Sequence, residues 1–528
     1  MNRPNILFAF ADDWGRYASA YAELQGQHSI NHLISTPNFD RIASEGALFT
    51  HAHVPAPSCT PCRSSVLSGR YFWQTGLGAI LSGAVWDRRI PSYPFILQDA
   101  GYHIGFSDKV WGPGTPQDDP YGGAGNRFQS FGGDFNNFSF YVGRADQTPM
   151  GIATAKEELC EQLRGNFRSF IEAREGDRPF CYWWGPTNTH RKWLRGSGKA
   201  HWGLEPDQLK GRLPDFLPDV HEVREDVADY LGECMAFDKG LGTLIDELEA
   251  MGELDNTLVV VSGDHGIPGF PRAKCNLYDI GCEVALAARL PSRIPQGRVI
   301  DDMINIMDLC PTFIDIAGAD IPAMAGKSLL PVLQSPQQGQ VDSSRTFVIT
   351  GRERHVAEAR DWNLPYPQRA IRTHDFLYIR NYKPDRWPMG DPRGLDDLDA
   401  TPPSYEELCE NTFVAYADMD SSPTKAWMVH HRSDRDVRGA FQLGFDKRLE
   451  EELYDLNVDP HCMHNLANHE AYSSIRQKLA GHLHDELVAQ QDPRALDGDQ
   501  CRFEKAPFTD HKKTEKTPEE RLAMLGNL

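Results

Sequence analysis

The chain has 528 residues, of which 40% are hydrophobic, and its formal net charge is −21 at pH 7. This size and apolar content suit a large globular enzyme with a full core and one or more further domains. The acidic excess argues against nucleic acid and anionic membrane surfaces as partners, because both bind basic footprints. No apolar run approaches the roughly 20 residues of a membrane helix, so no membrane partner is expected.

The N-terminus lacks the pattern of a signal peptide. Its apolar run follows directly on Arg3 and Pro4, and Asp12 and Asp13 interrupt it before any small-residue cleavage site. A buried first strand over residues 5–10 is predicted instead. The chain is then cytoplasmic, or periplasmic or secreted if a leader has been trimmed. The 11 cysteines have no spacing typical of zinc sites, and most are expected to be reduced, buried thiols.

Strands and helices alternate over the first two thirds of the chain. The pattern predicts helices over 37–45, from 64 to the stop at Gly69, over 93–100, and over 222–251. Further strands are predicted over 47–54, 102–106, 180–184, 257–261, 284–290 and 345–350. Continuous apolar strands between helices indicate an α/β fold, with a large mixed, mostly parallel sheet sandwiched by helices.

The pattern of predicted strands and helices changes after about residue 365. Residues 368–371 and 376–381 are predicted to pair as antiparallel strands, and 404–411 and 470–490 to be helical. From residue 497 the chain is polar and charged, typical of a tail that wraps the surface or frays. The sequence thus predicts a catalytic α/β domain over 1–365. A smaller C-terminal α+β subdomain with a small antiparallel sheet, helix and surface tail follows over 366–528.

Acids and imidazoles follow three of the predicted strands. Asp12 and Asp13 come after the first, His190 after 180–184, and Asp264 and His265 after 257–261. In open α/β sheets ligands bind beyond the carboxyl ends of the strands, and neighbouring carboxylates repel unless a cation binds them. Hard oxygens favour Ca²⁺ or Mg²⁺, and the imidazole leaves a transition metal possible. Each acid taken alone could instead be a turn or helix cap.

A cysteine precedes a predicted helix in the segment 58–70, which reads Ser-Cys-Thr-Pro-Cys-Arg-Ser-Ser-Val-Leu-Ser-Gly-Arg. Cys59 lies near the helix N-terminus, where anions are favoured, and Arg63 lies one turn along and can hold an oxyanion. The residues alone indicate a reactive thiol at an anion site.

This segment resembles the signature of the sulfatase family, part of the alkaline-phosphatase-like superfamily. The signature is Cys-x-Pro-x-Arg followed by Leu-Ser/Thr-Gly, matched by Cys59, Pro61, Arg63 and residues 67–69. The family usually has Ser where this chain has Cys62. The stretches at 5–13, 262–266, 305–318, 326–329 and 452–456 are similar to further conserved segments of the family.

The resemblance implies that Cys59 is oxidised to formylglycine by a formylglycine-generating enzyme. One hydroxyl of the hydrated aldehyde then attacks sulfur and the alcohol leaves; loss of the second hydroxyl's proton re-forms the carbonyl and expels sulfate. It also implies one divalent cation at Asp12, Asp13, Cys59, Asp264 and His265, with Ca²⁺ expected first and Mg²⁺ or Mn²⁺ as alternatives. The metal polarises the sulfate oxygens.

By the same resemblance, Arg63 supports the formylglycine and Lys109 contacts both it and the sulfate. His190 acts near the leaving-group oxygen, and Lys274 contacts the sulfate from the far side. The family commonly has Lys-x-His after the strand that corresponds to residues 102–106, but here Trp111 stands in place of that histidine. The base that releases sulfate is therefore unassigned. Lys109 and Lys274 could alternatively be solvated loop residues, and His190 could bond the backbone.

A basic and polar cluster is predicted to bind substrate. Glu353, Arg354, His355 and Arg369 resemble the corresponding stretches of N-sulfoglucosamine sulfohydrolases (sulfamidases) and bacterial glycan sulfatases. Planar guanidinium groups suit anionic substituents, so a sulfated saccharide, or another small sulfate ester, is the expected substrate. The alternative for the cluster is a domain junction held by ion pairs.

Two other functions remain open at the level of sequence. A phosphonate or phosphate ester hydrolase of the same superfamily can share both Cys-x-Pro-x-Arg and Asp-His-Gly. An inactive carbohydrate-binding relative is motivated by Trp111, although such a protein has no need to keep Cys59, Arg63 and the three aspartates.

Overall fold

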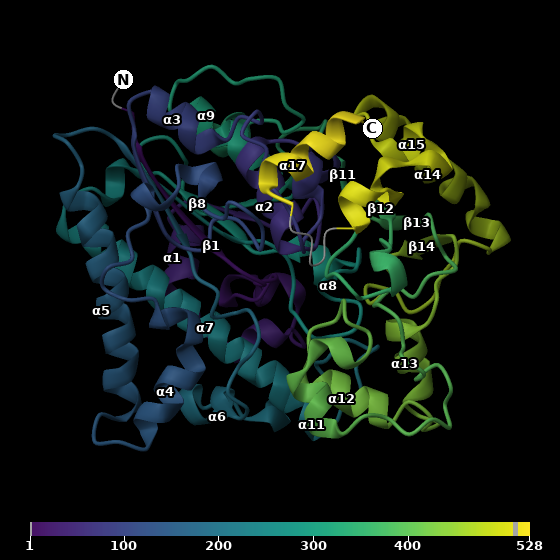
Figure 1. The fold of residues 1–528 in the computed structure, drawn as a ribbon. Helices are drawn as coiled ribbons and strands as arrows, with labels where there is room; N and C mark the ends of the chain where they lie inside the picture. Colours follow the sequence, from purple (N-terminus) through teal and green to yellow (C-terminus); the bar gives the residue numbers. More distant parts are fainter. Residues whose placement is uncertain (1–2, 511–515, 528) are drawn as a thin grey trace.

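A seven-stranded mixed sheet forms the centre of the molecule, with helices on both faces (Figure 1). The computed structural model describes residues 3–510 and 516–527. The strands run parallel to their neighbours except β8, which is antiparallel to both β6 and β2. The predicted mixed, mostly parallel sheet is confirmed. Its order is β4 (His103–Asp108), β5 (Phe180–Gly185), β1 (Asn5–Ala11), β6 (Thr257–Gly263), β8 (Leu286–Arg289), β2 (Ala47–Phe49) and β9 (Arg298–Ile300).

The central strand β1 divides its side chains between two cores. Ile6 and Phe8 point into one core, Leu7 and Ala9 into the other, and all four are fully buried. Because both faces are covered, the strand reads as a continuous apolar run. The first face is covered by α2 (Cys59–Ser68), α3 (Tyr93–Asp99) and α9 (Leu309–Ile316), and the second by α1 (Pro37–Ser44), α5 (Gly151–Glu172) and α7 (His221–Ala250).

Two predicted strands are each divided between two sheets. The stretch 47–54 forms β2 and then β3 (Ala52–His53), and 284–290 forms β8 after the end of β7 (Glu283–Val284). Strands β3 and β7 join β10 (Ile304–Asn305) in a small separate sheet. At Thr50 the hydroxyl donates to Asp301 Oδ1 at 2.7 Å. That side-chain bond holds the chain where it leaves the main sheet. The prediction of one continuous strand in each of these two stretches was wrong.

A four-stranded antiparallel sheet lies in the C-terminal region, to the right in Figure 1. The predicted pairing of residues 368–371 with 376–381 is confirmed, with Ile371 opposite Tyr378. Its first strand comes before residue 365, where the domain boundary is predicted. The strands in order are β11 (Phe347–Arg352), β12 (Gln368–Thr373), β13 (Phe376–Asn381) and β14 (Glu451–Asp455).

The last part of the chain packs back onto the body rather than fraying where it is described. Phe503 and Phe508 belong to the same buried cluster as Trp73, whose indole N–H donates to the Gln490 carbonyl at 3.1 Å. None of the helices in the described ranges has both the length and the apolar composition needed to traverse a bilayer. The remaining helices are α4 (Phe138–Asp146), α6 (Ser197–Trp202), α8 (Asp279–Cys282), α10 (Leu330–Gln334), α11 (Tyr405–Glu410), α12 (Pro423–His430), α13 (Arg438–Phe445), α14 (Ser473–Ala489), α15 (Pro493–Leu496), α16 (Ala506–Thr509) and α17 (Pro518–Ala523).

The sheet order places three strand ends side by side. Strands β5, β1 and β6 are consecutive and parallel, and Ala11 at the end of β1 lies opposite Gly263 at the end of β6. The residues that follow these strands therefore emerge at one edge of the sheet. This edge is where ligands bind in open α/β folds.

Gly263 allows this edge to close tightly, and adding a methyl group there should disrupt it. A Cβ at Gly263 would lie 2.0 Å from the carbonyl oxygen of Trp14. Gly263→Ala should therefore lower the free energy of unfolding by about 1–3 kcal/mol. Gly481→Ala is the matched control, because Gly481 lies on the exposed face of α14 and a Cβ there meets nothing within 4 Å. Denaturant unfolding should show that control to be as stable as wild type or more so; equal stability of both variants would contradict the close approach.

Candidate active site

Acidic and imidazole side chains converge at the carboxyl ends of β1 and β6. Asp12, Asp13, Asp264 and His265 are all at most 1% exposed. The backbone N–H of Asp13 donates to Asp264 Oδ1 at 2.8 Å, and His265 Nε2 lies 3.1 Å from Asp13 Oδ1. The predicted convergence of residues from distant parts of the chain is confirmed.

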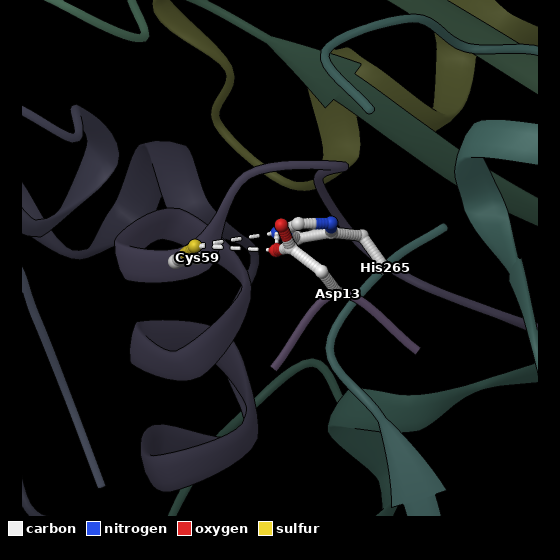
Figure 2. A group of neighbouring side chains, drawn as sticks. All are labelled: Asp13, Cys59 and His265. Atoms are coloured by element: carbon white, nitrogen blue, oxygen red, sulfur yellow. Dashed lines mark hydrogen bonds and ion pairs between the residues drawn. The ribbon is translucent and has the colours of Figure 1, made fainter. Parts of the chain in front are cut away.

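Cys59 lies beside this acidic group (Figure 2). Its Sγ is 3.3 Å from His265 Nε2 and 3.8 Å from Asp13 Oδ1. Helix α2 begins at Cys59 itself, earlier than the predicted start at residue 64, because Pro61 is compatible with a first helical turn. The thiol therefore belongs to the first turn, where backbone N–H groups lack intrahelical partners and anions are favoured.

The donor atoms fit a divalent cation. Carboxylate oxygens and an imidazole nitrogen are ligands of Ca²⁺, Mg²⁺ and Mn²⁺, and burial would leave these carboxylates repelling one another. Within each of three groups, the ligand atoms lie within 4.8 Å of one another. The groups are Asp13, Cys59 and His265; Asp12, Cys59 and Asp264; and Asp12, Asp13 and His190.

Arg63 connects two of the acids rather than facing an oxyanion. Its Nε donates to Asp264 Oδ2 at 2.8 Å, and its Nη2 donates to Asp12 Oδ1 at 3.0 Å. Its Nη1 donates to the Lys109 carbonyl at 2.9 Å, and the side chain is fully buried. All three nitrogens are thus engaged, so Arg63 positions the carboxylates. The expectation that it holds an oxyanion is corrected.

Two lysines complete the charge balance. Lys109 Nζ donates to both oxygens of Asp12 at 2.8 Å, and Lys274 Nζ donates to Asp13 Oδ2 at 2.8 Å. Burial would raise the pKa of the Asp12 carboxyl, but Lys109 and Arg63 outweigh it and hold that pKa well below its usual range. Burial and the charge of Asp12 raise the pKa of Asp264. Three carboxylates therefore face three positively charged side chains.

The environment of Cys59 keeps its thiol neutral. Burial, reinforced by the negative charge of Asp12, raises the pKa of the thiol well above its ordinary value. Because the thiolate is the nucleophilic form of cysteine, the unmodified side chain is a weak nucleophile at pH 7.

His190 lies at the open side of the group. Its side chain is 34% exposed, and its Nε2 lies 3.9 Å from Asp13 Oδ2. Trp111, by contrast, is completely buried and donates its indole N–H to Ser64 Oγ at 2.8 Å. An indole has no basic nitrogen, so Trp111 cannot serve as a proton acceptor.

The four residues predicted to bind substrate do not form one cluster. His355 is buried next to the site, and its Nδ1 lies 2.8 Å from Ser58 Oγ, on the residue before Cys59. Arg354 is buried as well, and its guanidinium donates to the Ser82 carbonyl.

Glu353 and Arg369 lie instead in a buried ion-pair network. Arg369 Nη2 donates to Glu353 Oε1 at 2.8 Å, and its Nη2 also lies 3.0 Å from Asp492 Oδ1. Arg494 holds the other carboxylate oxygen of Glu353 at 2.6 Å. Because these four charges satisfy one another across the junction with the C-terminal segment, the direct substrate contact predicted for Glu353 and Arg369 is replaced by a structural role.

Three residues of the site were not among the predicted catalytic, metal-binding or substrate-binding residues. Tyr230, on α7, donates its hydroxyl to the Asp13 carbonyl at 3.0 Å, and the Thr189 hydroxyl donates to the Asp12 carbonyl. Asp420 lies 3.2 Å from Lys274 Nζ through its Oδ2. Thr189 sits next to His190 in the sequence and could have been found from the strand end. Tyr230 and Asp420 have no local sequence signal.

Comparisons with known proteins agree with this geometry. Residues 4–319 match the family model described as Sulfatase, and residues 269–411 match one described as N-sulphoglucosamine sulphohydrolase, C-terminal. The N-sulphoglucosamine sulphohydrolase of Homo sapiens is 25% identical over 510 residues, covering 91% of this chain and 89% of that protein.

Two solved structures share the fold. One is a complex with its substrate D-glucosamine-2-N,6-O-disulfate, with a TM-score of 0.57 and 19% identity, covering 95% of this chain and 100% of that one. The other is the phosphonate monoester hydrolase of Agrobacterium radiobacter, with a TM-score of 0.59 and 19% identity. The match covers 94% of this chain and 97% of that one.

Replacing a carboxylate of the group should weaken metal binding. Asp264→Asn keeps the shape of the side chain but removes a charged ligand, so metal affinity should fall by at least about 10-fold. Metal analysis of the purified protein and titration after chelation measure the change. Asp302→Asn is the control, since Asp302 is also fully buried but accepts the backbone N–H groups of Val341 and Asp342 outside the site. Wild-type metal content in Asp264→Asn would refute the ligand assignment.

Replacing Arg369 separates a structural role from a substrate contact. Arg369→Met leaves Glu353 and Asp492 as buried acids without this partner, so the free energy of unfolding should fall by about 3–5 kcal/mol. Arg380→Met is the control on the neighbouring strand, where Arg380 lies opposite Arg369 and is 36% exposed. That change should alter stability by less than about 1 kcal/mol. A raised KM in Arg369→Met with unchanged stability would restore the substrate-binding role.

Proposed function

The chain belongs to the sulfatase family, and we propose that it hydrolyses sulfate esters or sulfamates of a sulfated saccharide in a metal-dependent reaction. Its nucleophile in this proposal is Cys59 after conversion to formylglycine by a formylglycine-generating enzyme. Asp12, Asp13, Asp264 and His265 are the proposed metal ligands, together with the modified side chain.

One observation carries this proposal: the position of Cys59 relative to the acidic group. Its Sγ is a member of two of the groups whose ligand atoms lie within 4.8 Å of one another, one with Asp13 and His265 and one with Asp12 and Asp264. The side chain also starts helix α2, whose free N–H groups favour an anion. These positions support a nucleophile, a cation site and an anion site at one place.

The charges of the site suit a sulfate group. Three carboxylates already balance Arg63, Lys109 and Lys274, so a bound divalent cation would leave the site positive. When bound, that cation would polarise the sulfate oxygens. Lys109 is 13% exposed and Lys274 3% exposed, and each can turn part of its hydrogen-bonding capacity toward an incoming sulfate.

His190 is the proposed proton donor to the leaving group. It is the most exposed side chain of the group, so it is accessible to a substrate that arrives from solvent. Its Nδ1 lies 2.5 Å from the Arg191 carbonyl, which orients the ring so that Nε2, 3.9 Å from Asp13 Oδ2, can face the leaving atom.

Calcium is the proposed metal, with Mg²⁺ or Mn²⁺ as alternatives. The three aspartates supply hard oxygen ligands, which Ca²⁺ prefers at coordination numbers of about six to eight. His265 is the one nitrogen ligand, and it makes the smaller transition-metal ion Mn²⁺ the alternative to test.

A saccharide substrate is supported by the names of the relatives. The human relative is an N-sulphoglucosamine sulphohydrolase, and one structural neighbour holds a glucosamine carrying both an N- and an O-sulfate. Both substituents present the same tetrahedral sulfur and anionic oxygens. The proposal therefore covers both and leaves the position on the sugar to assay.

Removing the nucleophile should abolish turnover without unfolding the chain. Cys59→Ala should lower the hydrolysis of an aryl sulfate by at least about 10⁴-fold, because the covalent route is lost. Cys62→Ser is the matched control, since it changes a neighbouring thiol on the same helix and keeps Cys59, Pro61 and Arg63. Circular dichroism should show wild-type folding for both, and full activity in Cys59→Ala would reject the mechanism.

The same wild-type preparation should be assayed on a sulfate ester, a sulfamate and a phosphonate monoester carrying the same aryl group. The proposal expects a higher kcat/KM on one of the sulfur substrates. Dominant phosphonate hydrolysis would assign the chain to the alternative activity of the superfamily.

A further inference from the structure

A fourth carboxylate reaches the site from the C-terminal region. Asp420 Oδ2 lies 3.2 Å from Lys274 Nζ, which in turn donates to Asp13 Oδ2. The Asp420 side chain is 18% exposed, whereas Lys274 is 3% exposed and Asp13 is fully buried. Asp420 therefore lies on the outer side of Lys274, between the proposed metal ligands and solvent.

The loop that carries Asp420 is firmly held. On one side, Asp418 Oδ2 lies 2.7 Å from Arg360 Nη2. On the other, Ser422 caps helix α12 by accepting the N–H of Lys425 and donates to the Gly269 carbonyl at 2.7 Å. The buried ammonium of Lys425 also donates to the Met419 carbonyl at 2.9 Å. Asp420 is thus presented at a fixed position.

The charge of Asp420 is not required by the balance of the site. Burial would raise the pKa of its carboxyl, but Lys274, with contributions from His190 and His355, holds that pKa well below the ordinary value. Lys274 is already paired with Asp13. An additional anion beside an anion-binding site weakens sulfate binding, so recognition of a different group would account for its presence there.

The carboxylate has unused hydrogen-bonding capacity. Within residues 3–510 and 516–527, the one polar contact found for the carboxylate is that of its buried Oδ2 with Lys274 Nζ at 3.2 Å, and no bond to Oδ1 is found. An ionised carboxylate is an acceptor with room for several donors. The groups it would recognise are hydroxyl and amino groups.

We propose that Asp420 determines substrate specificity, by accepting a hydrogen bond from a hydroxyl or amino group of the sugar next to the sulfated position. The same charge repels a second sulfate at that neighbouring position. This inference rests on the proposed function, because it presumes that a sulfated sugar occupies the space beside Lys274. It makes the enzyme selective for substrates whose adjacent position is unsulfated.

The test compares substrates with and without the neighbouring donor. The first probe is 4-nitrophenyl sulfate, and the second is the monosulfated glucosamine, 2-N- or 6-O-sulfated, that wild type turns over. The third is the analogue of that sugar without the neighbouring hydroxyl, which is the 3-deoxy analogue of the 2-N-sulfate or the 4-deoxy analogue of the 6-O-sulfate. The fourth is the sugar that carries a second sulfate on that same hydroxyl. Wild type should lose about 10- to 100-fold in kcat/KM on the deoxy analogue, as expected for one hydrogen bond to a charged group. It should discriminate against the disulfated counterpart as well.

The variant Asp420→Asn should lose about 10- to 100-fold on the monosulfated sugar and become insensitive to removal of the hydroxyl. Its loss on the monosulfated sugar should exceed its loss on 4-nitrophenyl sulfate by at least about 10-fold, because the aryl substrate has no neighbouring donor. Discrimination against the disulfated sugar should relax. Asp434→Asn is the matched control, since Asp434 is 57% exposed and pairs with His431 away from Lys274. Asp420→Ala provides a second variant for the same comparison.

Two results would overturn the inference while leaving the proposed function intact. An equal loss on the aryl sulfate and on the sugar would mean that Asp420 only positions Lys274. Indifference of wild type to the neighbouring hydroxyl would mean that no donor is recognised there. If wild type turns over none of the sulfates, the aryl sulfate included, the proposed function itself fails and the Asp420 assignment falls with it.

Discussion

Three carboxylates buried together at one edge of the sheet are the constraint on which the rest of the site depends. Asp12, Asp13 and Asp264 lie at the ends of adjacent strands, where burial would leave their charges uncompensated. Arg63 links two of them from helix α2, and the lysines after β4 and β6 neutralise the remainder. The contacts that compensate the acids also hold α2 in place, so the same interactions bring Cys59 to the acidic group.

Much of this arrangement could be predicted from the sequence. Apolar runs that end in acids indicate buried strands with polar residues at their carboxyl ends. Because ligands bind beyond the carboxyl ends of the strands in open α/β sheets, such residues are expected to lie together. The convergence of Asp12, Asp13, Asp264 and Cys59 is accordingly confirmed by the geometry. What local pattern could not supply is the strand order that makes β5, β1 and β6 neighbours, because that order depends on packing between distant segments.

The errors have the same physical origin. Glu353 and Arg369 looked like a basic and polar substrate cluster, but their partners Asp492 and Arg494 lie more than a hundred residues further along the chain. A charge-rich segment has the same composition whether it faces a ligand or a buried counter-charge. Asp420 was missed for the converse reason, since its link to Lys274 joins two loops without any shared motif. The periodicity of apolar residues likewise could not show that short consecutive strands, such as β2 and β3, lie in different sheets.

We propose that the side chain at position 59 is oxidised and acts beside a metal held by the three aspartates. Mass analysis of the peptide that ends at Arg63, after expression together with a formylglycine-generating enzyme, shows whether this oxidation occurs. Active preparations should contain an aldehyde in place of the thiol at Cys59, trapped by a carbonyl reagent, in proportion to their activity. An unmodified thiol at Cys59 in a fully active preparation would contradict it.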